Sequence, residues 1–510
     1  MKGSGLFTIR DVLFYGGQDP DHTAIESPGC PPVTYRDLRY QVSSLVTSLN
    51  ARGFHRNDRI ALITPPGPET AALLVSVMAG FTAVPFNPQC TAEEYRKFFS
   101  QTGIRAVIAR KDGPGEALAV AAAGTIPVIE WIPVPREDGI YALIPPGAPG
   151  SGPAEYAEDS DFAYVLQTSG TTAKAKIVPV TQRRLCHNKD TVHRLIHITK
   201  NDRCLHILPF YHGMGLGSAL ISTLIAGGTV ICPRDFIPSD FPELLKITRP
   251  TWYAAGPALQ KAILKEVRKL SPEDRTSHSL RIIRSTSGFL PEQVRLELEG
   301  LLNVPVIESY GMSEALTITM NIPPKPGSVG LPVTDSLRIG DENGCTLPAG
   351  HTGEILIRGI SVFPGYDNAP DENRAAFLDG WFRTGDLGYL DCDGYLYLTG
   401  RTKDLINKGG EKIAPAEIDS ALLLYCGVSD AMSFPVRDPI LGEDIAAMVV
   451  RNRDSVSEKD LRDFLLDRLQ PAKIPRKIYF VGSIPKNAAG KPLRHEGTRM
   501  YGGQEQKLSG

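Results

Sequence analysis

The chain has 510 residues, several times the length of a typical domain, so its length favours several packed units over one small module. With 42% hydrophobic and 22% charged residues, the composition excludes a wholly disordered, collagen-like or coiled-coil chain. Lys and Arg number 55 against 57 Asp and Glu, which gives a net charge of -2. No bulk field therefore attracts nucleic acid or an anionic membrane, and function must reside in local sites.

The cysteines and the start of the chain indicate a cellular setting. Eight cysteines show no paired short spacing of the kind that metal ribbons and redox motifs need, so we expect mostly buried thiols. Residues 1–14 lack a basic stretch followed by an apolar core and a cleavage site, so a secretory signal is not expected. A reducing, cytoplasmic setting follows.

In chain order, short β-rich runs alternate with helical patterns through the first three hundred residues, which predicts parallel α/β sheets in two similar lobes. Two uncharged stretches, 70–92 and 213–232, are interrupted by proline, asparagine and paired glycines, so we expect a buried helix followed by a buried strand in each, and no membrane span. Strands are expected at 59–62, 83–86, 106–109, 127–130, 203–207, 228–232, 251–255, 282–285 and 305–309, and helices at 35–52, 92–102, 215–226, 257–269 and 291–302.

The pattern changes after about residue 325. Short strands and glycine turns at 335–339, 353–358, 388–390 and 394–399 predict a small β-rich, barrel-like unit. Beyond Arg401 a compact α+β pattern predicts a separate small domain. The expected fold is α/β, with an N-terminal domain at 1–402 and a small mobile α+β domain at 403–510, and 145–153 reads as a surface connection.

The first chemical motif follows a strand at residues 164–167. A glycine and four hydroxyls, with two lysines behind them, present N–H groups, O–H donors and positive charge suited to a polyphosphate. This is not a Walker loop, because the only Gly-Lys pair of the chain, at 490–491, is followed by Pro492. A solvated Ser/Thr loop is the alternative reading. The residues concerned are Thr168, Ser169, Gly170, Thr171, Thr172, Lys174 and Lys176.

Three further segments carry candidate groups. Glu314 follows a buried strand, where ligands of open α/β sheets bind, and it could hold Mg²⁺ or merely start a helix. Asp386 could accept two ribose hydroxyls, and Arg401 supplies a planar donor fork. Lys491 lies on a turn near the C-terminus, where a lysine is ordinarily solvated. Each of these signals is weak alone.

Together these motifs resemble the adenylate-forming superfamily of acyl-CoA synthetases, aryl-CoA ligases, peptide-synthetase adenylation domains and beetle luciferases. The resemblance covers nearly the whole chain, and the amino-acid sequence of 406–413 is most similar to that of stand-alone acid–CoA ligases. The specific pieces occur in the family's order at 168–176, 310–314, 380–386, 400–417 and 485–491.

The resemblance implies a two-step reaction. A carboxylate attacks the α-phosphorus of ATP to give acyl-AMP and pyrophosphate, and a thiol then attacks the acyl carbon and releases AMP. ATP, Mg²⁺ and coenzyme A are the implied cofactors, and a small carboxylic acid is the implied substrate of a monomer or homodimer. The alternatives are a stand-alone enzyme that loads a carrier protein and a catalytically inactive nucleotide-binding regulator.

The resemblance also implies roles for single residues. The loop from Thr168 to Thr172, with Lys176, should grip the β and γ phosphates, and Lys491 should contact the carboxylate and α-phosphate. Lys403 stands at the hinge of a rotating C-terminal domain, whose second face would bring Gly410 to the pantetheine arm. The remaining nucleotide positions are Glu308 and Tyr310 at adenine, Gly311 beside them, Glu314 on Mg²⁺, and Asp386 and Arg401 at ribose.

The acyl pocket of this family is built from segments that here lie at 208–214, at 252–256 and after Gly311, so Trp252, Gly311 and Met312 are expected to line it. His212 occupies an aromatic gate position, although a hydrogen-bonded buried histidine is the alternative. These segments hold no charged residue, which favours an apolar or aryl acid. The phosphate loop departs from the family pattern at Ala173 and Ala175, where glycine and proline are usual.

Overall fold

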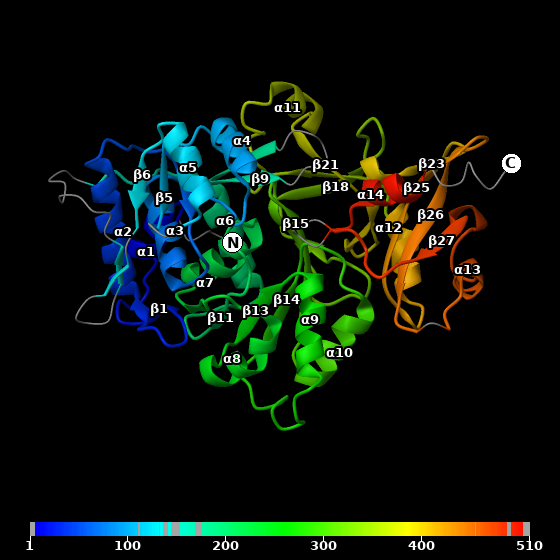
Figure 1. Ribbon diagram of the computed structural model, residues 1–510, viewed down its shortest axis with the longest axis horizontal. Helices are drawn as coiled ribbons and strands as arrows, with labels where there is room; N and C mark the ends of the chain where they lie inside the picture. Colours follow the sequence, from blue (N-terminus) through cyan, green and yellow to red (C-terminus); the bar gives the residue numbers. More distant parts are fainter. Residues whose placement is uncertain are drawn as a thin grey trace.

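The computed structural model describes residues 6–110, 113–131, 133–135, 141–143, 154–168, 176–453, 455–486 and 491–502. Residues 169–175 of the predicted phosphate loop and the predicted connection at 145–153 lie outside the described residues. Figure 1 shows a large body with two sheet-and-helix parts, coloured blue to cyan and green, and a smaller orange-to-red part at the C-terminal end.

The first sheet has six strands. It is parallel except at one edge, where the two strands that come last along the chain form an antiparallel hairpin. Thr168 and Lys176 lie opposite each other in that hairpin, so the two ends of the predicted phosphate loop are held together. The strand order is β10 (Lys176–Thr181), β9 (Phe162–Thr168), β4 (Thr82–Pro85), β3 (Arg59–Ile63), β5 (Ala106–Ala109) and β6 (Val128–Glu130).

The second sheet has nine strands, six of them in a parallel run from β1 to β15. Its two edges are antiparallel. The order is β17 (Leu331–Pro332), β16 (Leu316–Met320), β15 (Val306–Met312), β14 (Ile282–Ser285), β13 (Trp252–Ala255), β11 (Arg203–Leu205), β12 (Thr229–Ile231), β1 (Thr23–Glu26) and β2 (Val33–Thr34).

Helices connect these strands, as the alternating pattern predicted. Three of the first four begin with a threonine whose side chain and a carboxylate three residues later cap each other's backbone N–H groups. The helices are α1 (Ile9–Tyr15), α2 (Tyr35–Asn50), α3 (Pro68–Gly80), α4 (Ala92–Thr102), α5 (Gly115–Ala123), α6 (Gln182–Leu195), α7 (Ser222–Ile225), α8 (Phe241–Thr248), α9 (Pro257–Val267) and α10 (Glu292–Leu302), with the 3₁₀ turn η2 (Pro238–Asp240).

Both uncharged stretches are a buried helix followed by a buried strand, as predicted. Every residue of α3 is buried, and β4 follows it. In the second stretch the expected helix begins as the π-helix η1 (Met214–Ile221) and continues as α7 before β12. Within the described residues, no helix is long and apolar enough to cross a membrane.

A third, antiparallel sheet follows: β18 (Ser336–Gly340), β19 (Gly353–Arg358), β21 (Trp381–Leu390), β20 (Phe377–Leu378) and β22 (Leu396–Arg401), with helix α11 (Pro370–Ala376). The strand predicted at 388–390 is only the end of β21, which contains the motif at 380–386. The glycines of that motif concealed the strand. Gly385 has a φ of 72°, and the register shifts between Leu387 and Gly388.

The C-terminal part forms its own sheet: β24 (Glu411–Ile413), β23 (Ile406–Lys408), β26 (Gly442–Arg451), β25 (Val428–Asp438) and β27 (Lys477–Phe480). Its hydrophobic clusters contain only residues from 406 onward, whereas the other clusters end at Leu396. Its other elements are η3 (Thr402–Asp404), α12 (Pro415–Leu423), α13 (Glu458–Leu466), η4 (Pro471–Lys473) and α14 (Arg494–Tyr501). A separate two-stranded hairpin, β7 (Pro133–Pro135) and β8 (Tyr141–Leu143), belongs to the first lobe.

The cysteine prediction was only partly right. All eight are free thiols, but only Cys186, Cys204 and Cys232 are buried. The spacing of cysteines carries no information on burial, which depends on the face of the strand or helix that each occupies.

Candidate active site

A buried carboxylate at the third sheet joins three sequence motifs. Asp386 on β21 lies directly opposite Arg401 on β22, and Nε of Arg401 approaches Oδ1 of Asp386 at 2.8 Å. The hydroxyl of Tyr310, from β15 of the second sheet, donates to Oδ2 of Asp386 at 2.6 Å. Burial opposes the charge of Arg401, but the carboxylates of Asp386 and Asp404 raise its pKa above the ordinary value.

This arrangement leaves Asp386 able to bind hydroxyl groups. Each oxygen of the carboxylate has one of these two partners, and a carboxylate can accept about four hydrogen bonds in all. Thr384 fixes the local backbone, since its hydroxyl accepts from the N–H of Asp386 at 3.1 Å and donates to the carbonyl of Ile355 at 2.8 Å. The site can therefore accept two adjacent hydroxyls, as the prediction for ribose requires.

A second carboxylate, Glu314, follows the end of β15. The hydroxyl of Tyr366 donates to Oε1 of Glu314 at 3.0 Å, and Nζ of Lys176 lies 4.4 Å from the centre of the Tyr366 ring. Tyr366 thus connects the predicted magnesium carboxylate with the lysine that ends the predicted phosphate loop. No group of three His, Cys, Asp or Glu that could hold a metal exists among the described residues. One carboxylate with phosphate and water suits Mg²⁺, which keeps several waters in nucleotide sites.

Lys491 of the C-terminal part lies against these groups. The surrounding protein lowers the pKa of its ammonium, the positive charges of Arg401 and Lys403 act in the same direction, and the carboxylates of Asp386 and Glu314 oppose them. Lys491 nevertheless keeps an exposed surface, so it stays in contact with solvent. The structure therefore brings the terminal lysine to the carboxylates of both motifs.

His212 belongs to the same region. Burial lowers the pKa of its imidazole, and the charge of Lys491 lowers it further. Its ring lies 4.7 Å from that of Tyr211, and its carbonyl accepts from the N–H of Leu216 at the start of η1. The neighbouring His206 is the more typical buried histidine, because its Nε2 lies 2.9 Å from the carbonyl oxygen of Gly215.

Other predicted residues lie apart from this cluster or serve packing. Trp252 is fully buried in an apolar cluster with Ala219 and Ala254, so its place in an acyl pocket stays a prediction. Gly410, with a φ of 94°, lies in the exposed turn between β23 and β24, and Lys403 is exposed in η3. Gly311 pairs with Thr317 of β16, and Met312 packs on the core of the third sheet.

Glu308 lies within electrostatic range of the charged residues of helix α10. Burial raises the pKa of its carboxyl to about 7; Arg295 counteracts this, while Glu299 and Glu292 add to it. Its predicted place at the edge of adenine is not tested by these contacts.

Sequence reasoning missed several residues of this region. Tyr366 gave no signal, because a tyrosine in a loop after a strand is common. Buried Arg184 donates to the carbonyls of Ser361 and Ser313 at 2.6 Å, and so fixes the segment before Glu314. Buried Arg284 did leave a signal, because it is a charged residue inside a strand predicted to be buried on both faces.

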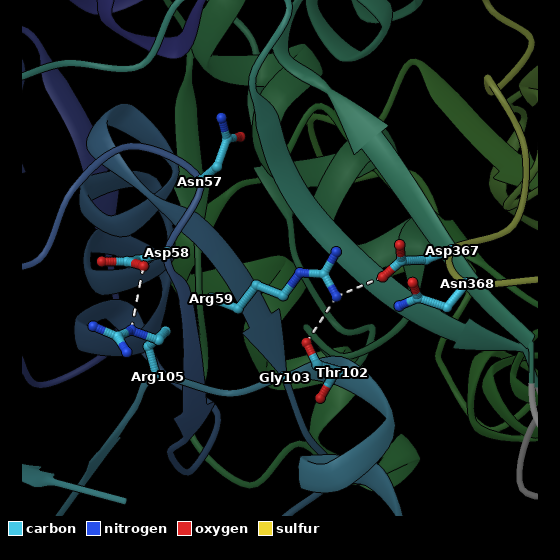
Figure 2. A pocket seen from close by; sticks show the side chains of 8 residues that line it. All are labelled: Asn57, Asp58, Arg59, Thr102, Gly103, Arg105, Asp367 and Asn368. Atoms are coloured by element: carbon cyan, nitrogen blue, oxygen red, sulfur yellow. Dashed lines mark hydrogen bonds and ion pairs between the residues drawn. The ribbon is translucent and has the colours of Figure 1, made fainter.

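A separate hollow of about 360 Å³ lies at the edge of the first sheet (Figure 2). Its charged groups are already paired, since Arg59 approaches Asp367 at 2.6 Å and donates to the carbonyl of Thr102 at 2.7 Å, and Arg105 lies 3.4 Å from Asp58. None of the residues of the Asp386 and Glu314 clusters lines it. Those clusters therefore form the candidate active site.

Comparison with known proteins identifies the family. The model of the AMP-binding enzyme family matches residues 15–367, and that of the AMP-binding enzyme C-terminal domain matches residues 417–491. The chain belongs to the AMP-binding enzyme family. Three similar relatives are a probable CoA ligase of Humulus lupulus (36% identical, covering 93% of this chain and 92% of the relative), the sulfoacetate–CoA ligase of Cupriavidus necator (35%, 95% and 96%) and the oxalate–CoA ligase of Arabidopsis thaliana (34%, 93% and 95%).

Solved structures of family members have the same overall architecture. ATP-bound MatB from Rhodopseudomonas palustris is 30% identical, with a TM-score of 0.88 over 98% of this chain and 99% of that one. The apo form of the same protein gives 0.81 at the same coverage. The arrangement of this chain is thus more similar to the ATP-bound form than to the apo form.

Proposed function

We propose that this AMP-binding enzyme is an acid–CoA ligase, which uses ATP and Mg²⁺ to convert a carboxylic acid into an acyl adenylate and then into a thioester of coenzyme A. The observation that carries the proposal is that Asp386 pairs with Arg401, and that the charges of Asp386, Arg401 and Glu314 all act on Lys491. Glu314 lies in the part that the AMP-binding enzyme model matches and Lys491 in the part that the C-terminal-domain model matches, whereas Asp386 and Arg401 lie between the two matched parts. The named CoA ligases among the relatives support the same reaction.

The residues have separate proposed tasks. Asp386 would accept the ribose hydroxyls, with Arg401 and Tyr310 holding its carboxylate. Lys491 would place its ammonium where negative charge develops as the carboxylate attacks the α-phosphorus. Glu314, oriented by Tyr366, would hold Mg²⁺, which neutralises phosphate charge when bound. The predicted phosphate loop, 169–172 with Lys176, would hold the β and γ phosphates.

We further propose a domain boundary between residues 402 and 403, with Lys403 as the hinge. The hydrophobic clusters on either side of η3 share no residue, which supports two units that can move relative to each other. Rotation would withdraw Lys491 after adenylation and bring the turn of Gly410 to the cleft for thiol entry. The higher TM-score with the ATP-bound relative supports the adenylation arrangement for this structure.

The acceptor and the setting are also proposals. Coenzyme A is favoured by the relatives, which are named CoA ligases, and a carrier protein would be the other acceptor. The cytoplasm is the proposed location, because eight free thiols suit a reducing compartment. The test therefore compares free CoA with a carrier-protein pantetheine as acceptor.

The decisive experiment measures carboxylate-dependent pyrophosphate release across a library of acids. Lys491→Ala should lower adenylation by about 10² or more, whereas thioester formation from supplied acyl adenylate should largely survive, because the ammonium acts only in the first step. Lys486→Ala is the matched control, since this lysine of the same segment pairs with Asp430. Absence of pyrophosphate release with every acid, or equal loss of both half-reactions in Lys491→Ala, contradicts the proposal.

A further inference from the structure

Two cations are buried beside the proposed acyl-binding segments and contact no carboxylate among the described residues. Lys189 of α6 and Arg284 of β14 are each 1% exposed. Each buried ion costs several kcal/mol of desolvation free energy, so native proteins normally pair it with an opposite charge. Arg184, the third buried cation of this region, differs because main-chain carbonyls accept from its guanidinium.

The guanidinium of Arg284 is only partly satisfied. Nη2 donates to Oγ of Ser309 at 3.3 Å, but Nε and Nη1 have no partner in the described part of the chain. Burial lowers the pKa of Arg284 to about 10, so the group stays protonated at neutral pH. Trp252, which shares this face of the sheet, likewise leaves its indole N–H without a partner. Such unpaired donors are rare in native interiors and need a reason.

Lys189 is held close by. Its Nζ lies 3.0 Å from Oδ1 of Asn188, 3.3 Å from Oγ of Ser218 and 3.4 Å from Oγ1 of Thr317. Burial lowers the pKa of Lys189, and the charges of Arg284 and Arg184 lower it further. A side chain at Gly217 of η1 would come within 2.9 Å of Cε of Lys189, so the glycine makes room for the lysine.

The hydrogen-bond partners place both cations at the acyl segments. Ser309, the partner of Arg284, lies two residues before Gly311 on β15, and Thr317, a partner of Lys189, pairs with Gly311 across the hairpin. Ser218, another partner of Lys189, lies in η1, which follows the segment of His212. Both cations thus contact residues on or next to the segments expected to line the acyl pocket.

We propose that the acid which this enzyme activates carries a second anionic group, a carboxylate or sulfonate, and that Arg284 binds this group with the support of Lys189. This rests on the proposed function. A planar guanidinium binds such groups through two parallel hydrogen bonds, and the anion supplies the missing counter-charge. An acid with an apolar end would leave both unpaired nitrogens of Arg284 buried, which costs binding free energy.

This substrate class differs from the apolar or aryl acid expected from the sequence. That expectation used only segments 208–214 and 252–256 and the residues directly after Gly311, which hold no charge before Glu314. Lys189 and Arg284 come from α6 and β14, outside those segments.

The test compares acids that differ only at the remote end. Malonate is paired with propionate, and succinate with butyrate, in assays of ATP-dependent thioester formation. Because a site built to hydrogen-bond a polar group rejects the analogue that lacks it, kcat/KM should be at least about 10²-fold higher for the better diacid than for its matched monoacid. Equal or higher values for the monoacids overturn the inference, although the ligase function would stand.

Substitutions test whether the preference for the diacid depends on Arg284. Arg284→Met should remove the preference for the diacid by lowering kcat/KM for the diacid far more than for the monoacid, and the variant should fold because replacing a buried cation with an apolar group of similar size is often neutral or stabilising. Ile282→Met, two residues earlier on the same strand and in the apolar cluster of Trp252, should keep the preference. Equal loss with both acids in Arg284→Met would instead indicate a structural role and overturn the assignment.

A binding measurement on the unmodified enzyme depends neither on turnover nor on whether Arg284→Met folds. In the presence of AMP, the diacid should raise the melting temperature of the unmodified enzyme, and the matched monoacid should raise it less. Arg284→Lys, which keeps the charge but loses the planar fork, should increase the KM for the diacid by about 10-fold or more. If no acid supports pyrophosphate release, the ligase function fails, and the melting shift alone decides whether this site binds a dianionic acid.

Discussion

Burial sets the charge state of single residues around the site. Glu308 has a carboxyl pKa of about 7, chiefly because it is removed from water, and the groups facing it from α10 are Glu292, Arg295 and Glu299. The unfolded chain releases this proton near pH 4.3, so between about pH 4.3 and pH 7 the folded protein binds more protons than the unfolded one. The contribution of Glu308 to stability therefore falls as pH rises through this window.

Glu308→Gln should remove that dependence. The variant is expected to be more stable than the parent at pH 8, by on the order of 1–3 kcal/mol, and about equally stable at pH 4. Urea unfolding at both pH values measures the difference. Glu297→Gln on helix α10 is the control. Because Arg268 lowers the pKa of Glu297, this substitution should instead lower the stability at pH 8. A gain at pH 4 as large as at pH 8 would contradict the assignment.

At the scale of secondary structure, the hairpin of β15 and β16 joins nucleotide and acyl segments. Gly311 pairs with Thr317, and a Cβ at Gly311 would collide with the carbonyl oxygen of Leu316 and lie 3.1 Å from its carbonyl carbon. Only glycine lets the two backbones approach this closely. The spacing in turn places Thr317 at Lys189 and Tyr310 at Asp386.

Gly311→Ala should consequently lower the free energy of unfolding by about 1–3 kcal/mol, as expected when backbone must shift to admit a side chain. Gly300→Ala is the control, because a Cβ there meets no atom within 4 Å and alanine suits the interior of α10; we expect a gain of up to about 1 kcal/mol. Chemical denaturation of both variants measures their free energies of unfolding. Equal changes in the two variants would contradict the close approach of the backbones at Gly311.

At the scale of the whole molecule, function depends on how the C-terminal part rests on the rest. Gly400 of β22 lies so close to Ala414 that a Cβ at Gly400 would be 2.9 Å from the Cβ of Ala414. Two further contacts join the parts: an ion pair between Lys412 and Glu342, and a hydrogen bond from Nζ of Lys261 to the carbonyl of Ser429 at 3.4 Å. Both of these contacts are polar, which suits the domain movement proposed above.

Gly400→Ala should disfavour the present placement of the C-terminal part against β22 and leave other placements of that part accessible. Adenylation should fall several-fold, whereas thioester formation from supplied acyl adenylate should change less, because only the first step uses Lys491. Gly482→Ala, in the C-terminal part with no atom within 4 Å of its Cβ, should alter neither step. Separate assays of the two half-reactions check this, and a uniform reduction of both would argue against a moving domain.

The sequence by itself determined the fold class and named most of the residues that we propose to face the nucleotide. Strands at 106–109 and 282–285 matched the prediction, because continuous apolar runs bounded by turns have few other solutions. Asp386, Arg401 and Glu314 could be named because each lies in a motif of adjacent residues.

Tertiary structure alone decided which residues meet. Tyr366, Lys189 and Arg284 come from three separate segments; Tyr366 and Lys189 look ordinary in theirs, and the charge of Arg284 inside a buried strand does not by itself say what it meets. A hydrogen bond between residues far apart along the chain depends on sheet order and strand register, which local pattern does not encode. The unpaired charge of Arg284 in particular exists only when β14 is covered on both faces.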